Sequence, residues 1–310
     1  MTGAKPDSSH VDFIGVSTKL SSIIRIFPLW ADALGLPTRR INGVDVRLDA
    51  EPGEYRQVVG RIAANSLDLG ALVTTHKIAV VEHAGDLFDE FDELATTFGE
   101  ISSIAKRGGR LIGSAKDPVT VRLALEEIIA AGHFRSTGAE ALVLGAGGSG
   151  NALGYQLGVR GDTPQRITVT DRRESSLRRA RELHERGGLD AGRFRYLRTD
   201  APDEVDRLIA ELPDSSLVVN ATGMGKDRPG SPMTDHVVLP RHAVVWEFNY
   251  RGELDFLRQA RAQREQRQLR VEDGWRYFIH GWSQVIADVF EIPMPAERVA
   301  ELSAIAQAVR

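Results

Sequence analysis

The stretch EALVLGAGGSGNALGYQLGVRG, residues 140–161, decides the fold of this chain. It joins an apolar, strand-like run to a glycine-rich turn and then to an apolar helical pattern. Gly145, Gly147 and Gly150 have G-x-G-x-x-G spacing, in which the first glycine permits a tight turn and the second lets the backbone approach a pyrophosphate. Free N–H groups at the start of the following helix would bind that anion. The stretch predicts a Rossmann-type βαβ unit that binds a dinucleotide, with a ligand-free strand-to-helix turn as the alternative.

The sequence on both sides of this stretch alternates short apolar runs with helical ones. That alternation favours parallel strands joined by crossover helices. Asp117-Pro118 opens a helix that we take as the bridge between the halves, because aspartate caps a helix and proline suits its first turn. We predict an α/β protein of two α/β domains with a cleft between them, the second a Rossmann-type doubly wound parallel sheet. Residues 1–117 with the C-terminal helices 285–310 would form the first domain, and residues 118–284 the second.

Composition narrows the chemistry and the partners. The absence of cysteine removes disulfides, thiolate metal sites and cysteine nucleophiles. The net charge of −4 comes from interspersed charges of both signs, so we expect neither nucleic acid nor a membrane as partner. No apolar run approaches the roughly 20 residues that cross a bilayer, and residues 1–13 lack the apolar core of a secretion signal, which predicts a cytoplasmic protein. The eight histidines show neither H-x-H nor H-E-x-x-H spacing, so we predict no metal site.

The end of the next predicted strand bears on the choice of dinucleotide. Asp171 could accept hydrogen bonds from the adenosine ribose hydroxyls and would repel a 2′-phosphate, which favours NAD. Arg172 and Arg173 follow it, and guanidinium groups suit a phosphate, so NADP stays the alternative. The residues predicted to bind the cofactor here and in the turn are Gly145, Ala146, Gly147, Gly148, Ser149, Gly150, Asp171 and Arg172.

A second feature, in the first half of the chain, is a lysine placed where an apolar strand ends. ALVTT, residues 71–75, runs directly into His76 and Lys77. A lysine at this position is either a solvated residue that opens a helix or a group that the function needs. Farther along the same half, Gly108-Gly109 predicts a β-hairpin.

Five short motifs, taken together, indicate a family. They are VTTHK at 73–77, GRLIGSAKD at 109–117, GAGGSG at 145–150, NATGMG at 220–225 and EDGWRYFIH at 272–280. In this order and spacing the chain resembles the shikimate and quinate dehydrogenase family over nearly its full length. The resemblance implies an enzyme of aromatic amino acid biosynthesis that reversibly oxidises a ring hydroxyl to a ketone, with a nicotinamide as hydride acceptor.

By motif position, the resemblance makes Lys77 and Asp117 the catalytic pair. Loss of hydride from carbon requires the hydroxyl proton to leave, and an amine within hydrogen-bond reach can accept or return that proton. Asp117 would hold Lys77 in place and share in the proton balance. The same aspartate can also cap its helix, and both roles are compatible.

In the cofactor domain, three residues at the end of a strand, Asn220, Ala221 and Thr222, would let the nicotinamide ribose lie close. The alternative for Asn220 is that it merely caps a strand-end turn. Gly274 would give room for the nicotinamide ring, unless it is only the glycine that starts a helix.

The chain departs from the family where the family holds its substrate. The family's S-x-S pair is matched by Lys19 and Ser21, and its substrate-binding asparagine by Ser102. Its N-T-D asparagine and threonine become Ala115 and Lys116, and the proline of V-T-x-P-x-K is missing together with one residue. The C-terminal glutamine of the family falls on Gly281, with Gln284 a turn later. The residues predicted to bind substrate are Lys19, Ser21, Thr74, Ser102, Tyr250 and Gln284, of which Tyr250 could instead be a half-buried strand-end residue.

These exchanges predict a substrate other than shikimate, because a site that reads hydroxyl groups leaves buried polar groups unpaired when their partners are lost. Lys19, Lys77 and Lys116 near one cleft would favour an anionic hydroxy acid, cyclic or linear, with an extra carboxylate or a phosphate. Lys116 could instead point to solvent.

Two rival functions deserve comparison with a dehydrogenase. Glutamyl-tRNA reductase shares the general architecture but needs a cysteine thioester, which this chain cannot form. A non-catalytic regulator that binds the cofactor or a metabolite on the same fold is the alternative, and the absence of hydride transfer across a panel of hydroxy acids would reveal it. The expected partner is a small-molecule substrate, and a homodimer is left open because no interface pattern is legible.

Overall fold

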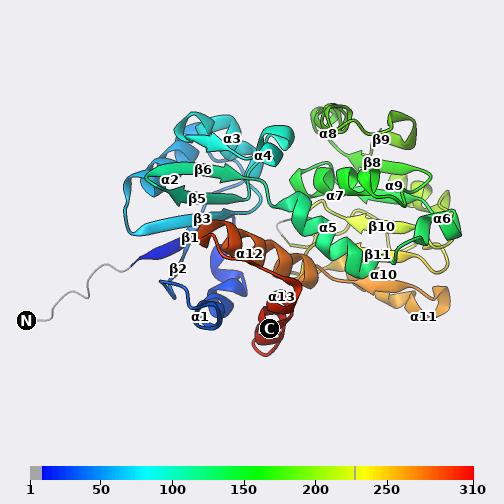
Figure 1. Ribbon diagram of the computed structural model, residues 1–310. Coiled ribbons are helices and arrows are strands. Elements are labelled where there is room, and N and C mark those ends of the chain that lie inside the picture. The colour runs from blue at the N-terminus through cyan, green and yellow to red at the C-terminus, as the bar shows by residue number, and fades with distance from the viewer. Residues whose placement is uncertain (1–8, 227) are drawn as a thin grey trace, which may run out of the picture. The chain divides into compact units, whose positions relative to one another are not determined.

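The computed structural model describes residues 9–226 and 228–310, which form two compact units. The first unit contains the described residues up to Lys116 together with Ile279–Arg310, and the second contains the described part of Asp117–Phe278. Each unit is built on one sheet, of six strands within the described residues (Figure 1). The predicted α/β class is therefore confirmed. Most of the N-terminal stretch in which we found no secretion signal lies outside the described residues.

The first unit has a mixed sheet with the strand order β2-β1-β3-β5-β6-β4. Its strands are β1 (His10–Gly15), β2 (Ile41–Asp45), β3 (Asp68–Val73), β4 (Glu90–Phe91), β5 (Ser103–Arg107) and β6 (Arg110–Ser114). Its helices are α1 (Ile23–Leu34), α2 (Pro52–Ala64), α3 (Lys77–Ala84), α4 (Glu93–Phe98), the larger part of α12 (Trp275–Phe290) and α13 (Ala296–Gln307). Short 3₁₀ turns lie at Thr18–Leu20 and Gly85–Leu87. β1, β2 and β3 run parallel, whereas β5 is antiparallel to both β3 and β6.

Local sequence explains the centre of this unit. β3 is buried at five of its six positions, as its nearly continuous apolar run requires of a strand with neighbours on both sides. α2 buries Tyr55, Val59 and Ile62, which recur at helical spacing and face the core shared with β3. The two left-handed glycines Gly108 and Gly109 join β5 to β6 with φ angles of 57° and 81°, so the predicted hairpin is confirmed.

The second unit has an all-parallel sheet with the strand order β12-β11-β10-β7-β8-β9. Its strands are β7 (Ala141–Leu144), β8 (Ile167–Asp171), β9 (Phe194–Arg198), β10 (Leu217–Asn220), β11 (Val244–Glu247) and β12 (Arg270–Glu272). Its helices are α5 (Asp117–Ile128), α6 (His133–Thr137), α7 (Gly148–Val159), α8 (Glu174–Arg186), α9 (Pro202–Ala210), α10 (Asp255–Ala262), α11 (Arg264–Arg267) and the start of α12, with a 3₁₀ turn at Ala191–Arg193.

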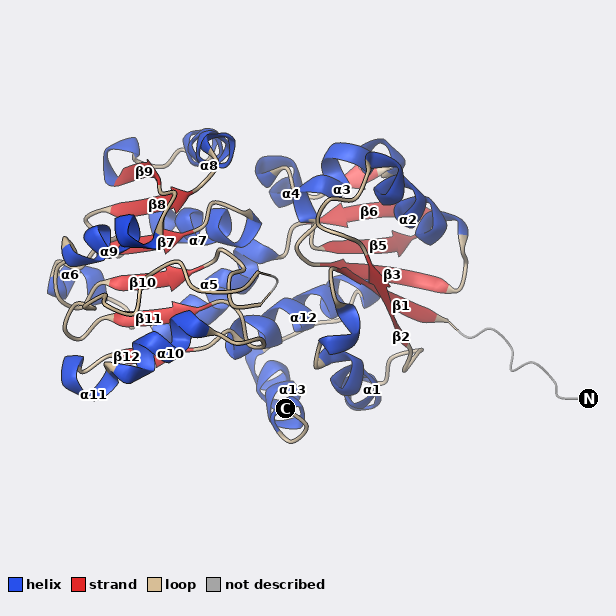
Figure 2. Cartoon of the chain, turned by 180° about the vertical axis from the view of Figure 1, so that it is seen from behind, coloured by secondary structure: helices blue, strands red, loops and turns tan. Residues whose placement is uncertain are grey.

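The strand order of this second sheet positions a site. The sequence of strands reverses between β7 and β10, so the loops that follow these two strands flank a topological switch point, where doubly wound sheets bind ligands. Figure 2 shows the neighbouring strands as red arrows with blue helices packed around them. α5 packs against α7, and α10 packs against β11 and β12. The predicted doubly wound sheet is confirmed.

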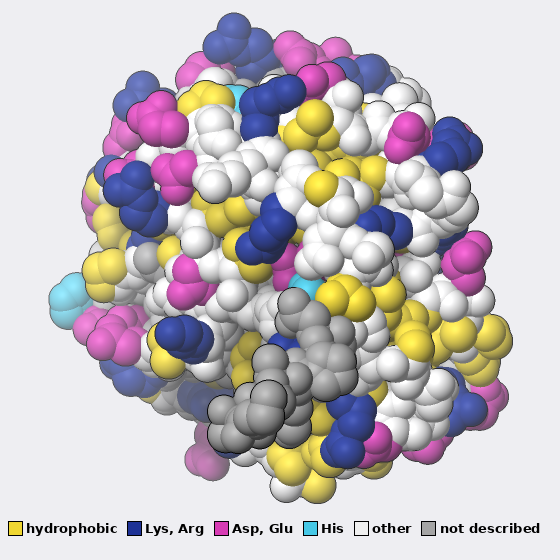
Figure 3. All heavy atoms as spheres, turned by 90° about the vertical axis from the view of Figure 1, so that its left-hand side faces the viewer, with side chains coloured by type: hydrophobic (Ala, Val, Ile, Leu, Met, Phe, Trp, Pro, Cys, Tyr) yellow, Lys and Arg dark blue, Asp and Glu magenta, His cyan; other side chains and the backbone are white. Residues whose placement is uncertain are grey.

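Two surface observations complete the description. On the face shown in Figure 3, Lys and Arg side chains are interspersed with Asp and Glu, as the charge pattern of the sequence indicated. Among the helices of the described residues, none has both the length and the apolar character needed to span a bilayer.

Candidate functional site

The glycine-rich turn joins β7 to α7 at the switch point of the second unit. Gly145 has a φ of +104°, and a Cβ atom on it would lie 2.7 Å from the carbonyl oxygen of Ala221, just after β10. A Cβ atom on Gly150 would lie 1.9 Å from the carbonyl oxygen of Gly145. Neither position can therefore carry a side chain unless the backbone moves.

Gly147 has different surroundings. Its backbone is extended, with φ −80° and ψ −175°, and a Cβ atom on it would meet nothing within 4 Å. This open space adjoins the first turn of α7, whose leading N–H groups have no partner within the helix. The residues present thus fit a pyrophosphate, because the backbone is open where a phosphate has to approach and the helix start supplies donors.

Asp171, the last residue of β8, is tied to this turn. Its Oδ2 accepts a 3.0 Å hydrogen bond from the N–H of Ala146, and its Oδ1 accepts a 2.9 Å bond from the N–H of Arg173. A carboxylate has about four acceptor positions, so these two bonds leave capacity for ribose hydroxyls. The arrangement places a negative charge at the strand end beside the two arginine residues 172 and 173.

The end of β10 is held by a buried polar network. Asn220 is fully buried, and its Oδ1 accepts a 2.6 Å bond from the hydroxyl of Thr222. Its Nδ2 donates to Oε2 of Glu247 at 2.6 Å, and Oε1 of Glu247 accepts from Nδ2 of Asn249, also at 2.6 Å. The side chain of Asn220 thus holds the strand-end turn, the alternative considered for it. The predicted contact of residues 220–222 with a nicotinamide ribose stays a prediction.

Glu247 itself was missed by the sequence reasoning. It is fully buried at the end of β11, and burial raises its pKa to about 7 although three hydrogen bonds to its oxygens act in the opposite direction. The signal available was a single glutamate within the buried run VVWEF. A carboxyl group in such a run needs partners, which Asn220 and Asn249 supply.

Asp117 lies beside the glycine-rich turn. It begins α5 and is only 5% exposed, and its Oδ2 accepts hydrogen bonds from the hydroxyl of Tyr277 at 2.9 Å and from the hydroxyl of Ser149 at 3.2 Å. The two hydroxyl oxygens are 3.1 Å apart. A predicted catalytic residue and a predicted cofactor-binding residue therefore share one hydrogen-bonded group, which we call the Asp117–Ser149–Tyr277 group.

Tyr277 was also missed by the sequence reasoning. Its ring stacks on Phe248 with centroids 4.7 Å apart, so packing fixes the direction of its hydroxyl. In sequence it is one aromatic residue among several in GWRYFIHGW, and nothing in that run distinguishes it from core residues. Only the fold, which brings the start of α12 to the start of α5, reveals its partner.

Two further predicted residues of this unit have clear packing roles. Tyr250 is half-buried against Trp275 and Phe278, with ring centroids 5.6 and 4.4 Å away. A Cβ atom on Gly274 would lie 2.1 Å from the carbonyl oxygen of Phe248, so close approach of the β11 end requires glycine there. Contacts of Tyr250 with substrate and of Gly274 with nicotinamide stay predictions.

Lys77 is the first residue of α3, in the first unit, and a tight turn after β3 presents it. Thr75 has a φ of +65°, which is strained for a β-branched residue. His76 is 4% exposed, and its ring nitrogens lie 3.1 Å from the hydroxyl of Tyr55 and 2.9 Å from the carbonyl oxygen of Val46. The histidine thus anchors the turn inward, and Lys77 is left half-buried next to it.

The ends of β1 and β3 bring other predicted substrate residues together. A Cβ atom on Gly15 would lie 2.9 Å from Cγ2 of Thr74 and 3.4 Å from Cγ2 of Thr18, so the segments after the two strands are adjacent. Lys19 is exposed in the 3₁₀ turn that begins at Thr18, and Ser21 follows it buried. The structure therefore places Lys19 and Ser21 at the same sheet edge as Thr74.

Ser102 and Lys116 are engaged by the protein itself. Ser102 is buried, and its hydroxyl oxygen accepts a 2.7 Å bond from the N–H of Lys116. The ammonium of Lys116 lies 3.3 Å from Asp92 and 3.0 Å from Asp288. Burial disfavours the charge of Asp288, but the neighbouring cations Lys116 and Arg107 outweigh it and lower its pKa below the usual value. The expectation of an anionic substrate thus depends on Lys19 and Lys77.

Two predictions about the site are left as predictions. Lys77 belongs to the first unit and Asp117 to the second, so their pairing is an expectation from the motif order. Gln284 lies half-buried in α12, in the part that belongs to the first unit, and its contact with substrate is likewise an expectation.

Comparisons with known proteins find similarity to shikimate and quinate dehydrogenases. A scan of protein-family models finds no match. The shikimate dehydrogenase (NADP(+)) of Symbiobacterium thermophilum is 34% identical over 219 residues, which cover 69% of this chain and 68% of that protein. The enzyme of the same name from Salinibacter ruber is 34% identical over 234 residues, covering 72% and 74%. The quinate dehydrogenase from Corynebacterium glutamicum in complex with NAD has a similar structure, with a TM-score of 0.72 and 22% identity over 97% of this chain and 99% of that one.

Proposed function

This chain belongs to the shikimate dehydrogenase family, and from that premise we propose that it reversibly oxidises a hydroxyl to a ketone on a small anionic cyclic hydroxy acid with NAD(P). The observation that supports this most directly is the Asp117–Ser149–Tyr277 group. It joins a carboxylate expected beside the substrate to the turn expected to bind the cofactor.

The second unit would hold the cofactor. Gly145, Gly147, Gly150 and the first turn of α7 would bind the pyrophosphate, and Asp171 would accept the adenosine ribose hydroxyls. A bound nicotinamide dinucleotide supplies the hydride acceptor. We favour NAD, because the Asp171 carboxylate would repel a 2′-phosphate. The guanidinium of the neighbouring Arg172 could bind that phosphate, so NADP is the alternative.

The first unit would supply the proton-handling lysine. In the oxidation direction Nζ of Lys77 accepts the hydroxyl proton as the carbonyl forms, and in the reverse direction it returns that proton. The inward anchor of His76 restricts the turn and so limits the positions that Lys77 can take. Tyr277 and Ser149 fix the orientation of the Asp117 carboxylate, which by motif position would hold Lys77 in place.

The charge near the ends of β1 and β3 supports an anionic substrate. Lys19 is exposed beside Ser21 and close to Thr74, where an ammonium and two hydroxyls could bind a carboxylate or phosphate. Lys116 does not add to this charge, because two carboxylates pair with it. A substrate with an acidic group placed differently from that of shikimate is therefore expected.

A spectrophotometric panel tests the proposal. The purified chain is assayed at the reduced-nicotinamide absorbance band with NAD or NADP and with shikimate, quinate, and aminated, phosphorylated and acyclic hydroxy acids. We expect turnover of an anionic substrate other than shikimate. Lys77→Ala should lower kcat by about 10²- to 10⁴-fold, whereas Arg122→Ala, on the exposed face of α5, should not change it.

A second outcome would contradict the proposal. If the chain binds NAD or NADP in a titration but turns over no member of the panel, a ligand-binding regulator explains the fold better than a dehydrogenase. Equal activity of Lys77→Ala and the unmodified chain would remove the lysine from the mechanism while leaving the dehydrogenase function in place.

A further inference from the structure

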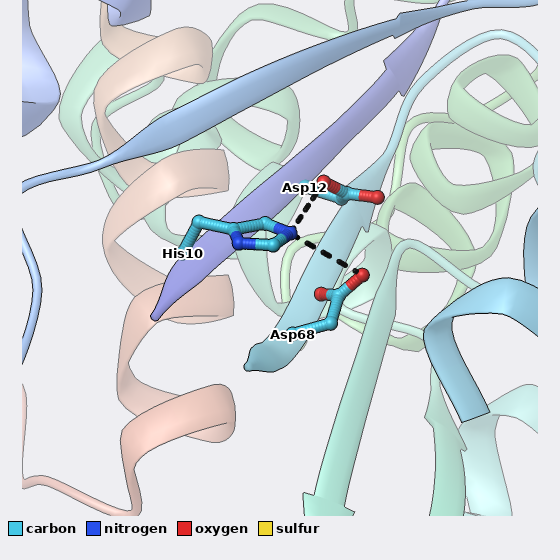
Figure 4. Close-up of side chains that lie close together, drawn as sticks. All are labelled: His10, Asp12 and Asp68. Carbon is cyan, nitrogen blue, oxygen red and sulfur yellow. Dashed lines mark ion pairs between the residues drawn. The ribbon is translucent and has the colours of Figure 1, made fainter. Parts of the chain in front are cut away.

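A cluster of three side chains lies at the amino-terminal ends of β1 and β3 in the first unit. His10 and Asp12 come from β1 and Asp68 from β3, and Figure 4 shows the three side chains pointing toward one another. His10 pairs with Asp68 across the two parallel strands. The cluster is at the opposite ends of these strands from Lys19 and Lys77, so it is separate from the proposed active site.

The two carboxyl groups of this cluster are buried. Asp12 and Asp68 are each 1% exposed. Within the described residues, neither side-chain oxygen of Asp68 has a hydrogen-bond partner of normal geometry, and its carboxylate points into the cluster (Figure 4). A buried carboxylate without such bonds is costly, and native proteins satisfy nearly all buried polar groups. Something that the protein itself does not provide is therefore expected beside Asp68.

The distances suit a metal ion better than direct hydrogen bonds. Nε2 of His10 is 3.6 Å from Oδ1 of Asp12 and 3.7 Å from Oδ2 of Asp68. Hydrogen bonds between N–H and oxygen are shorter, about 2.7–3.2 Å. Two ligands that each lie about 2.0–2.2 Å from one ion, at angles of about 110–120°, are about 3.3–3.8 Å apart. All three ligand atoms lie within 4.8 Å of one another.

Two features of the surroundings favour a metal ion. Arg61 donates to Oδ2 of Asp12, the oxygen that does not face His10, and such outer hydrogen bonds orient a ligating carboxylate. The side chain of His10 is 13% exposed, which gives an ion a path from solvent. One imidazole with two carboxylates suits a first-row divalent ion such as Zn²⁺, whereas Mg²⁺ and Ca²⁺ prefer oxygen ligands alone.

We infer that His10, Asp12 and Asp68 form a binding site for a divalent transition-metal ion of the Zn²⁺ type, which links the start of β1 to the start of β3. Two carboxylates and a neutral imidazole offset the charge of such an ion and leave at least one coordination position for water. The role is structural, since the site is at the opposite strand ends from the proposed catalytic residues.

The test measures Zn²⁺ binding and thermal unfolding of the full chain, purified without a histidine tag and stripped with a chelator. We expect one equivalent of Zn²⁺ to bind and to raise Tm, as binding to the folded state alone requires. Co²⁺ in its place should give the visible absorption of a low-coordinate site. His10→Gln and Asp68→Asn should each weaken Zn²⁺ binding at least about a hundredfold, since even outer-shell losses cost 10- to 100-fold. His236→Gln, which removes an exposed histidine, is the matched control and should bind as the unmodified chain does.

A proton is the rival occupant of the cluster. Burial and the neighbouring charge of Asp12 raise the pKa of Asp68 to about 7, so the two carboxyl groups could share a proton instead of an ion. In that case the unmodified chain shows no saturable Zn²⁺ or Co²⁺ binding, and the proposal is wrong. Binding that persists unchanged in both His10→Gln and Asp68→Asn, with each variant folded by circular dichroism, would also overturn it. Neither result depends on dehydrogenase activity.

Discussion

The hydroxyl of Tyr277 donates a hydrogen bond of 2.9 Å to Oδ2 of Asp117, across 160 positions of sequence. This bond joins the first turn of α12 to the first turn of α5. Ser149 donates to the same carboxylate oxygen, so the start of α7 belongs to the arrangement as well. The two hydroxyl groups therefore fix the orientation of the carboxylate.

Tyr277→Phe should lower kcat of the dehydrogenase reaction by about tenfold and leave the KM for cofactor nearly unchanged, because one positioning hydrogen bond is worth about 1.4 kcal/mol. The ring still stacks on Phe248, so the fold should be kept. Steady-state kinetics with the best substrate of the panel measures the effect. Tyr196→Phe is the control, since it removes a 2.8 Å phenol hydrogen bond to His184 on another part of the sheet. Equal losses of kcat in the two variants would show that Tyr277 has only a structural role.

Gly147→Val should weaken NAD binding, whereas Gly150→Ala should lower the stability of the fold. The added side chain at Gly147 meets nothing in the protein and fits the extended backbone, so Tm should stay nearly unchanged while NAD binding weakens at least about tenfold, because the pyrophosphate approach is blocked. The Cβ atom at Gly150 meets the Gly145 carbonyl, so that variant should lose about 1–3 kcal/mol of stability. Isothermal titration with NAD and thermal unfolding measure the two quantities. Unweakened NAD binding by folded Gly147→Val would place the cofactor elsewhere.

Asp171→Asn should shift the preference between cofactors toward NADP. The amide oxygen can still accept a hydrogen bond from the Ala146 N–H, but the negative charge that opposes a 2′-phosphate is gone. The ratio of kcat/KM for NADP to that for NAD should rise about tenfold, or about 1.4 kcal/mol. Asp200→Asn, which removes an exposed charge after the next strand, should leave the ratio as it is. An unchanged ratio in Asp171→Asn would mean that this carboxylate does not face the adenosine ribose.

Glu247 predicts a dependence of stability on pH. Burial raises its pKa to about 7 in the folded chain, above the unfolded value of about 4.3. The stabilisation from its neutral form is thus fully present below about pH 4 and is lost as pH rises through about 7, by up to about 4 kcal/mol. Urea unfolding at several values between pH 5.5 and 8.5 should show the decline.

The variant Glu247→Gln should flatten that decline, because the amide does not ionise. Its control is Glu182→Gln on the exposed face of α8, which should keep the slope of the unmodified chain. If Glu247→Gln follows the same slope, another group causes the pH dependence.

Short stretches of sequence predicted the features of the fold that depend on neighbouring residues alone. The glycine-rich turn, the hairpin at Gly108-Gly109 and the doubly wound second sheet follow from short stretches whose backbone requirements are visible in the residues themselves. Buried polar groups were harder to assign. Glu247 and Tyr277 each acquire their role from partners on other elements, and no spacing rule connects residues that meet only after folding.

Histidine patterns show the same limit. His10 and Asp12 have H-x-D spacing on one strand, which neither H-x-H nor H-E-x-x-H describes. The third residue of the cluster comes from the neighbouring strand, so no spacing along the sequence reveals it. Lys116 is the opposite case. It looked available for an anionic substrate, and the fold supplies Asp92 and Asp288 as its partners instead.

The three glycines of the turn are required for different reasons. A side chain at Gly145 or Gly150 would meet the neighbouring backbone, so stability favours glycine at both positions whether or not a cofactor binds. Nothing in the protein itself requires glycine at Gly147, because its Cβ position is empty, whereas the proposed function would require it for the approach of a phosphate. In a lineage that lost the cofactor, position 147 would drift to larger residues while positions 145 and 150 stayed glycine. The residue at position 147 could therefore distinguish relatives that still bind the cofactor from relatives that have another function.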